Sequence, residues 1–378
     1  MIKYSIQSVI LMVVWSWIPY IYAQYIDFDG SKMNGVINQS SEFMDMLLKD
    51  DKIKVIFRNG KSFTQATVDL SNLFQVKKKA TDSLVKAEDV DTNEKDLHNE
   101  LIVGSKKVDA DILVTQSERR KNTFVDSGWN IRFWKNSKAT GKAKLKNVKE
   151  IKNAYLIDAK NKTVVFAEEN GFFNKTIMVK VGFQLHQRGE KYDFKNEYDV
   201  FELPINIDQK MLPAAVIDNN GSKVAIFQES TKSIIEISSK GKKSLIPFFK
   251  ITEDKTPNQY IRSFFDHRTP VDIHYIQDGY LLVYDDCYCT IKKHEKQWKL
   301  EKKEMLTYEI VQSQPSQPTQ FSFSIQPQNT LKTHDISVVK SIFDQGNNTL
   351  YCLYTYKKGF KTGQSQKNYF GLYIKAGI

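Results

Sequence analysis

The residues with the greatest potential for chemistry gather in one stretch of the chain. They are Asp266, His267, Arg268, Asp272 and His274, with Asp285 and Asp286 a little further on. A carboxylate next to an imidazole can transfer protons. Loops that bring such side chains together could catalyse acid–base reactions or hold a metal ion. Aspartate and histidine are also common in turns. Asp266, His267, Asp272 and His274 are therefore candidate catalytic residues, with a role in turns as the alternative.

Motif searches add no further chemistry. The sequence lacks a nucleophile elbow, a phosphate-binding glycine loop, a His-Glu-x-x-His motif and an EF-hand loop. We therefore expect no cofactor and no metal, and the enzyme class stays open.

The elements that must position these residues repeat along the chain. The segment 154–168 (AYLIDAKNKTVVFAE) returns at 214–229 (AAVIDNNGSKVAIFQE), and Ile157-Asp158 recurs as Ile217-Asp218 after 60 residues (217 − 157). Each copy is an apolar run, an Asp, a polar turn and a second apolar run, which predicts a β-hairpin. We expect Asp158 and Asp218 to hydrogen-bond the backbone of their own turns. Similar hairpins are predicted at 273–284, with an Asp278-Gly279 turn, and at 338–356.

Further strand-like runs between the hairpins give each unit of about 60 residues roughly four strands. This arrangement predicts an all-β fold, a β-propeller-like array of antiparallel four-stranded sheets. Two packed β-sandwich domains are the alternative. We expect 369–374 (YFGLYI) to form the strand that closes the ring and removes an exposed sheet edge.

The pattern in NAYLIDAKNKTVVFAEE resembles the repeats of hemopexin-type four-bladed propellers. The resemblance would extend from Asn153 to the C-terminus and implies four blades. The chain lacks the aromatic motif expected after each hairpin, and no cysteines bracket the array. No functional residue is carried over, and a six- or seven-bladed ring is the alternative.

The N-terminal part of the chain divides into a leader and a β-rich segment. Residues 1–23 have Lys3, an apolar run of ten and the tripeptide Ile21-Tyr22-Ala23, which predicts a secretory signal peptide. Residues 24–122 form a β-rich segment, which could be the first blades, followed by the β-repeat domain at 123–378. Within the former we expect a short helix at 41–48, a hairpin around Asn59-Gly60 and another formed by 101–103 and 110–115. The charged segment 77–100 is expected to be an exposed loop, with an exposed helix as the alternative.

A secreted chain is expected to carry the modifications of the secretory route. Five Asn-x-Ser/Thr sequons predict glycosylation at Asn38, Asn161, Asn174, Asn220 and Asn347. With three cysteines, we expect one disulfide, joining Cys352 to Cys289 or Cys287.

The net charge of the chain is +11, from 55 Lys and Arg against 44 Asp and Glu. Basic proteins attract anionic partners, although a solvated lysine-rich surface accounts for the same excess. A strand carrying Lys142, Lys144 and Lys146, with Lys149 nearby, is the candidate anion-binding stripe.

These features together predict a secreted, extracellular propeller-like binding protein with a basic surface. Its expected partner is an extracellular protein or an anionic glycan, without nucleic acid binding or a transmembrane anchor. A propeller-type hydrolase or lyase using Asp and His on channel-facing loops is one alternative. A matrix component bound to anionic glycans is another.

Overall fold

A computed structural model describes the chain in separate ranges. These are residues 24–27, 42–59, 62–71, 85–89, 100–102, 112–117, 129–135, 138–145, 151–158, 163–170, 176–188, 191–203, 213–253, 263–306, 308–309, 330–331, 336–358 and 367–378.

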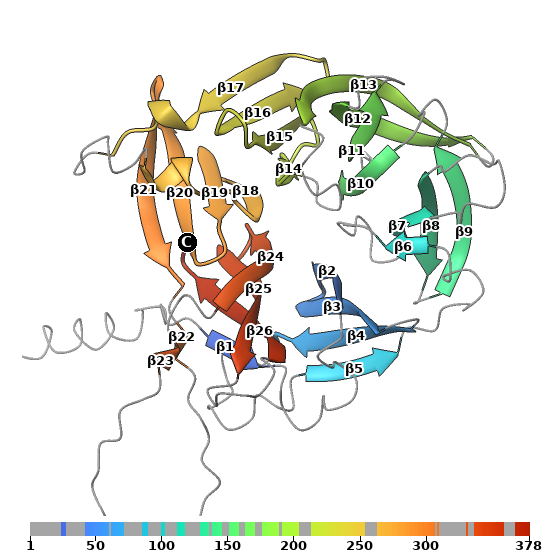
Figure 1. Ribbon diagram of the computed structural model, residues 1–378, viewed down its shortest axis with the longest axis horizontal. Helices are drawn as coiled ribbons and strands as arrows, with labels where there is room; N and C mark the ends of the chain where they lie inside the picture. The colour runs from blue at the N-terminus through green and yellow to red at the C-terminus, as the bar shows by residue number, and fades with distance from the viewer. Residues whose placement is uncertain are drawn as a thin grey trace, which may run out of the picture.

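The described strands form six four-stranded blades arranged in a ring, as a β-propeller does (Figure 1). Blade 1 comprises β2 (Glu42–Lys49), β3 (Lys52–Asn59), β4 (Ser62–Asp69) and β5 (Val85–Asp89). Blade 2 comprises β6 (Glu100–Ile102), β7 (Ile112–Ser117), β8 (Trp129–Lys135) and β9 (Lys138–Leu145). Blade 3 comprises β10 (Ile151–Asp158), β11 (Thr163–Asn170), β12 (Thr176–Arg188) and β13 (Lys191–Leu203). Blades 2 and 3 join into one sheet because the outer strands β9 and β13 pair in parallel, Lys144 with Lys191.

Blades 4 to 6 complete the ring. Blade 4 comprises β14 (Ala215–Ile217), β15 (Lys223–Gln228), β16 (Ser233–Ser238) and β17 (Lys243–Pro247). Blade 5 comprises β18 (Asp272–Ile276), β19 (Gly279–Val283), β20 (Cys287–His294) and β21 (Gln297–Met305). Blade 6 comprises β24 (Ile336–Asp344), β25 (Thr349–Lys358), β26 (Lys367–Ala376) and β1 (Gln24–Asp27). A 3-10 turn, η2 (Phe248–Lys250), follows β17, and a two-stranded pair, β22 (Tyr308–Glu309) and β23 (Thr330–Leu331), lies between blades 5 and 6 in sequence. The first strand of each blade faces the centre of the ring (Figure 1).

The four repeated hairpins occupy equivalent places, as the repeat predicts. Each is the inner pair of strands of its blade: β10–β11, β14–β15, β18–β19 and β24–β25. Ala154 lies opposite Phe166 in blade 3, and the Phe227 amide donates to the Ala214 carbonyl in blade 4. The predicted all-β propeller is confirmed. With six blades, the four-bladed architecture implied by the hemopexin-type resemblance is wrong.

The apolar runs of the inner strands β15 and β19 are continuous because both faces of these strands are covered. All five residues of β19 and the four central residues of β15 are buried. The core consists of layers of apolar side chains between neighbouring blades. Among the described residues, such layers lie between blades 1 and 6, 3 and 4, 4 and 5, and 5 and 6. Between blades 1 and 6, for example, Phe57 packs edge-on against Phe370, with ring centroids 4.9 Å apart.

The ring closes through pairing of the two ends of the described chain. β1 lies antiparallel to β26, with Gln24 opposite Ile374, so the first strand in sequence completes the last blade. The predicted closing segment 369–374 lies in β26 and takes part in this closure. The closure pairs the edge of β26 with β1.

Two local expectations in the N-terminal part are wrong. The segment 41–48, predicted as a short helix, is the inner strand β2, since both faces of that strand are covered and Met46 and Leu47 are buried. The charged segment 77–100, predicted as a loop, contains β5, which pairs with β4 at the edge of blade 1. The hairpins predicted around Asn59-Gly60 and at 101–115 form as β3–β4 and β6–β7.

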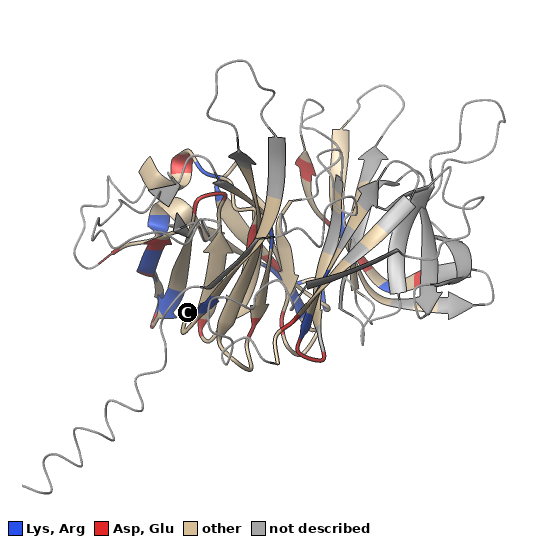
Figure 2. Ribbon diagram, turned by 90° about the horizontal axis from the view of Figure 1, so that it is seen from below, with Lys and Arg blue, Asp and Glu red and all other residues tan. Residues whose placement is uncertain are grey.

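The antiparallel order divides the loops between two faces of the ring. Turns joining strands 1–2 and 3–4 of a blade emerge on one face, here named the turn face. Loops joining strands 2–3, and the segments between blades, emerge on the other, here named the connection face. Figure 2 shows the short turns, several with red Asp or Glu, along its lower edge. The part of the chain that the structure describes contains no helix long and apolar enough to cross a membrane.

Candidate functional site

Arg268 is the centre of a polar cluster on the connection face of blade 5. It follows the helical turn 263–266 and donates to both carboxylate oxygens of Asp286, with Nη2 3.1 Å from Oδ2. Asp285 is also within ion-pair distance, at 3.9 Å. The sequence analysis grouped these residues, and the structure brings them together because Arg268 lies just before β18 while Asp285 and Asp286 form the β19–β20 turn.

The electrostatics of this cluster favour the ion pair. Burial alone would raise the pKa of Asp286, but hydrogen bonds from Arg268 and Cys287 outweigh it and hold the pKa below its ordinary value. Arg268 and Lys303 also lie against the ring of Phe264, at 5.1 and 4.0 Å from its centroid. The cluster is thus a charged, hydrogen-bonded part of the connection face.

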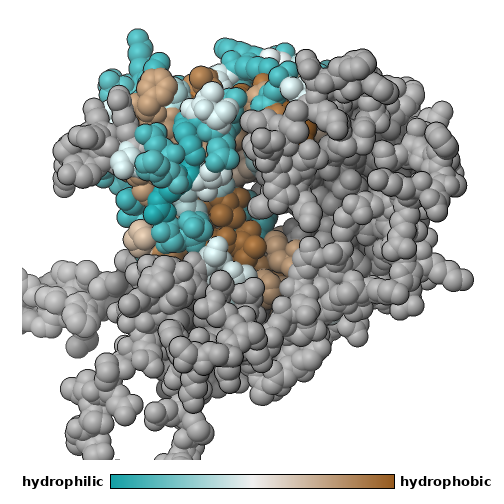
Figure 3. Space-filling model, viewed as in Figure 1, coloured by the Kyte–Doolittle hydropathy of each residue, from teal (hydrophilic) through white to brown (hydrophobic). Residues whose placement is uncertain are grey.

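Neighbouring groups extend the cluster toward blade 4. Lys232 Nζ donates to the Arg268 carbonyl at 3.2 Å, and Thr269 Oγ1 donates to Glu229 at 2.8 Å. Asp266 and His267 are exposed beside it. Figure 3 shows hydrophilic residues over blade 5, while apolar residues gather toward the centre of the ring.

The other two candidates, Asp272 and His274, lie between blades 5 and 6. Both are on β18, two positions apart, and face β24, where they meet Lys340 and Ser341; these four residues are here named the interblade network. Asp272 Oδ2 accepts from the Ser341 amide at 2.7 Å and from its hydroxyl at 3.2 Å. Lys340 Nζ donates to Asp272 Oδ1 at 2.7 Å, and His274 Nε2 lies 2.7 Å from Ser341 Oγ.

Ser341 is the shared partner in the interblade network, since both the Asp272 carboxylate and His274 Nε2 contact it. Ser341 is 0% exposed and His274 is 5% exposed. The geometry supports a role in joining the two inner strands. The catalytic assignment of Asp266, His267, Asp272 and His274 remains a prediction.

The remaining predicted sites are only partly within the described residues. Lys142 and Lys144 lie on β9, whereas Lys146 and Lys149 lie outside the described ranges. Asn220 and Asn347 are exposed in the strand 1–2 turns of blades 4 and 6, and Asn38, Asn161 and Asn174 lie outside the described residues. Asp218 accepts from the Ser222 and Lys223 amides, as predicted for its turn.

The structure does not contain the disulfide expected between Cys352 and Cys289 or Cys287, because all three cysteines are free and buried. Strand alternation separates them: Cys287 and Cys289 face blade 4, whereas Cys352 packs with Tyr288 on the opposite side of blade 5. Burial raises the pKa of Cys287 to about 12, so its thiol is protonated at neutral pH.

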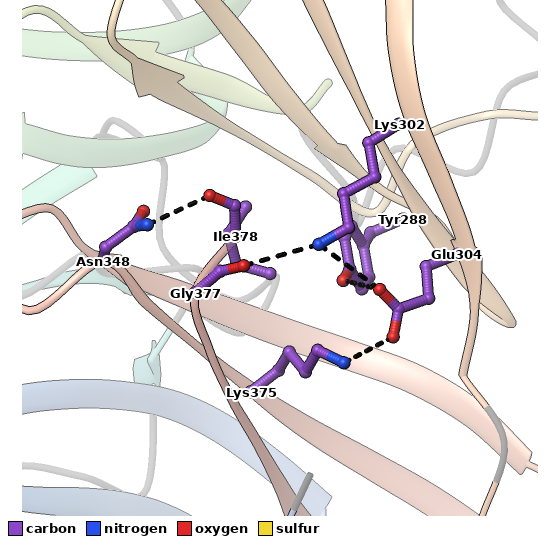
Figure 4. A network of polar contacts seen from close by, with 7 residues as sticks. All are labelled: Tyr288, Lys302, Glu304, Asn348, Lys375, Gly377 and Ile378. Atoms are coloured by element: carbon purple, nitrogen blue, oxygen red, sulfur yellow. Dashed lines mark hydrogen bonds and ion pairs between the residues drawn. The ribbon is translucent and has the colours of Figure 1, made fainter. Parts of the chain in front are cut away.

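Sequence reasoning missed a second network between the outer parts of blades 5 and 6 (Figure 4). Glu304 on β21 accepts from Lys375 at 2.6 Å and from the Tyr288 hydroxyl. Lys302 donates to the Gly377 carbonyl at 3.4 Å, and Asn348 to the Ile378 carbonyl at 3.0 Å. Because the donors and acceptors lie 16 to 75 residues apart, local patterning gives no signal for them.

Within the described ranges, no group of three or more His, Cys, Asp or Glu side chains is placed to hold a metal ion.

Comparison with known proteins finds likeness at the level of fold. No family model and no curated protein sequence matches the chain. A solved luciferin-regenerating enzyme is 11% identical, covering 94% of this chain and 95% of its own with a TM-score of 0.46. A catalytically inactive variant of virginiamycin B lyase from Staphylococcus aureus is 9% identical, covering 94% of this chain and 99% of its own with a TM-score of 0.39. Kluyveromyces lactis Hsv2 is 12% identical, covering 70% of this chain and 73% of its own with a TM-score of 0.34. These neighbours include both enzymes and another protein of propeller type.

Proposed function

We propose that this protein is a secreted β-propeller that binds an extracellular protein partner through the connection face around Arg268. The leader at 1–23 and the five sequons support the extracellular location.

Two long connections that meet at blade 5 carry the proposal. On the turn face of blades 3 to 6, the turns between strands have two to five residues, for example 277–278 and 218–222. On the connection face, 24 residues join β17 to β18 (248–271) and 30 join β21 to β24 (306–335). Both begin or end at blade 5, beside the Arg268 cluster. Binding residues in proteins are disproportionately on longer loops held by a rigid scaffold.

The location is tested by expressing the full chain in eukaryotic cells. We expect protein in the medium with Gln24 as its first residue. Retention inside the cell with an intact leader would contradict the extracellular assignment.

Binding is tested with the secreted protein on arrays of extracellular proteins and glycans. Asp266→Ala/His267→Ala changes two exposed groups of the connection face, and Lys240→Ala/Lys242→Ala changes two exposed lysines of the turn face as a control. We expect the first variant to lose at least about fivefold in affinity for the captured partner, because two side chains that would contact the partner are removed together. Equal loss in both variants, or loss in the control alone, would place the partner elsewhere.

A further inference from the structure

The hairpin end of blade 5 is a basic segment of the described chain, Lys292–Lys299 (KKHEKQWK), here named the basic hairpin. It joins β20 to β21 through the two-residue turn 295–296, on the turn face and therefore opposite the Arg268 cluster. Four lysines against Glu295 give it a net charge of +3 (4 − 1). Blue segments mark lysines along the outer rim of this blade at the left of Figure 2.

The strand register concentrates this charge. Lys292 lies directly opposite Lys299, and Lys293 directly opposite Trp298. Like charges directly opposite on neighbouring strands repel and reduce stability. One carboxylate offsets part of this repulsion, since the Glu301 carboxylate lies 2.8 Å from both Lys292 Nζ and His294 Nε2. Counting Glu301, the local charge is still +2 (3 − 1).

The two lysines nearest the turn are exposed. Lys293 and Lys296 have no side-chain ion pair within the described part of the chain, and both face solvent. The Lys293 amide donates to the Asp278 carbonyl at 2.9 Å, which fixes the hairpin to the inner turn of the same blade. The ammonium groups are thus held on a rigid support while their charge remains available.

The composition of this surface favours a polyanion over a folded protein. Lysine is depleted at the core of protein interfaces, which are built on buried aromatic and apolar residues. The exposed large apolar residues of the described chain are Leu245, Phe249 and Met305, none of them in the basic hairpin. Trp298 is half-buried and packs against Tyr280, with centroids 5.7 Å apart.

We propose that the basic hairpin is a binding site for a sulfated polysaccharide. Sulfate groups repeated along a linear chain can contact the exposed ammonium groups of Lys293 and Lys296 together, and the attraction is reduced by salt because these charges are exposed. The site would hold the protein on extracellular glycans while the connection face stays free for another partner. The choice of a sulfated glycan rests on the proposed secretion.

The test uses purified chain 24–378 and heparin as the sulfated probe, with poly-glutamate as a model acidic polypeptide. The variant is Lys293→Gln/Lys296→Gln. The control is Lys52→Gln/Lys195→Gln, which removes the same charge from exposed positions on blades 1 and 3. We expect the hairpin variant to bind heparin about fivefold more weakly near 0.1 M salt, and the control to change less than about twofold. Circular dichroism and thermal unfolding confirm that both variants are folded.

Three results would overturn the proposal: wild type not retained by heparin, equal weakening in both variants, or poly-glutamate bound as tightly as heparin. The last would indicate an acidic protein partner. Because binding is measured on purified protein, these failures are separate from a failure of secretion, which is read from the culture medium.

Discussion

Individual residues in this propeller act mainly through contacts between blades. Asp272 is the clearest case, since one carboxylate accepts from an amide, a hydroxyl and an ammonium group of the neighbouring blade. Its residue type and its closeness in sequence to His274 made it a candidate catalytic residue. Its side chain is only 3% exposed, and this burial supports a structural role in which Asp272 joins blades 5 and 6.

Replacing Asp272 tests this joining role. Asp272→Ala leaves the Ser341 amide without its acceptor and Lys340 without its partner, so we expect a loss of about 2–4 kcal/mol in the free energy of unfolding. Urea unfolding followed by circular dichroism measures it. Asp266→Ala, an exposed position of the same segment, should change stability by less than about 0.5 kcal/mol. Equal effects of the two changes would contradict the assignment.

Glu304 gives a prediction about acid stability. Burial alone would raise its pKa, but hydrogen bonds from Lys375 and Tyr288 lower it below the ordinary value. A carboxyl whose pKa is lower in the folded state stabilises the fold above its unfolded pKa of about 4.3, and this contribution is lost as pH falls through the folded pKa. In Lys375→Met we expect the midpoint of acid unfolding to move upward by about a few tenths of a pH unit.

The measurement is circular dichroism between about pH 6 and pH 2, a range that spans the carboxyl pKa values. Lys296→Gln serves as the control because Lys296 is exposed and has no ion pair in the described residues. An unchanged midpoint in Lys375→Met would show that the Glu304 contact contributes nothing to acid resistance.

At the scale of elements, the hairpin is the unit that the sequence encodes best. Apolar runs flanking Asp and Gly turns correctly placed the inner strands of blades 3 to 6. The edge strand β5 of blade 1 was missed because its sequence, VKAED, has few apolar residues, whereas the strand predicted to carry Lys142 and Lys144 forms as the outer strand β9 of blade 2. The helix predicted at 41–48 failed for a related reason: a short apolar run fits either structure, and packing between blades 1 and 6 selects the strand.

Gly279 tests how closely the strands of such a hairpin approach. A Cβ atom at this position would lie 2.0 Å from the Ile291 carbonyl oxygen, so the backbone of β19 or β20 would have to move. We expect Gly279→Ala to destabilise the protein by about 1–3 kcal/mol in urea unfolding. Gly346→Ala is the matched control, since its Cβ would meet only the Asp344 carboxylate at 3.3 Å. A smaller loss at 279 than at 346 would contradict the close approach.

The whole molecule is a ring whose closure depends on four residues at the start of the described chain. β1 covers the edge of β26, and an uncovered edge offers backbone donors and acceptors to other chains.

Removing this strand therefore gives a prediction about assembly. Compared with chain 24–378, a chain starting at Phe28 should unfold about 5 °C lower or more and should associate as its concentration rises. Thermal unfolding and size-exclusion chromatography with light scattering measure both. A monomer of unchanged stability would show that β1 does not contribute to closure.

The sequence by itself determined the hairpins, their repetition every sixty residues and the all-β class, because these depend on contacts close in the chain. The number of blades, the free cysteines and the partners of Asp272 and Glu304 were decided by tertiary structure. Each depends on which strand face meets the neighbouring blade; Glu304 and its partner Lys375, for example, lie 71 positions apart in the chain. The alternation of side chains along a strand follows from the sequence of that strand, but the blade that each face packs against is determined only when the ring closes.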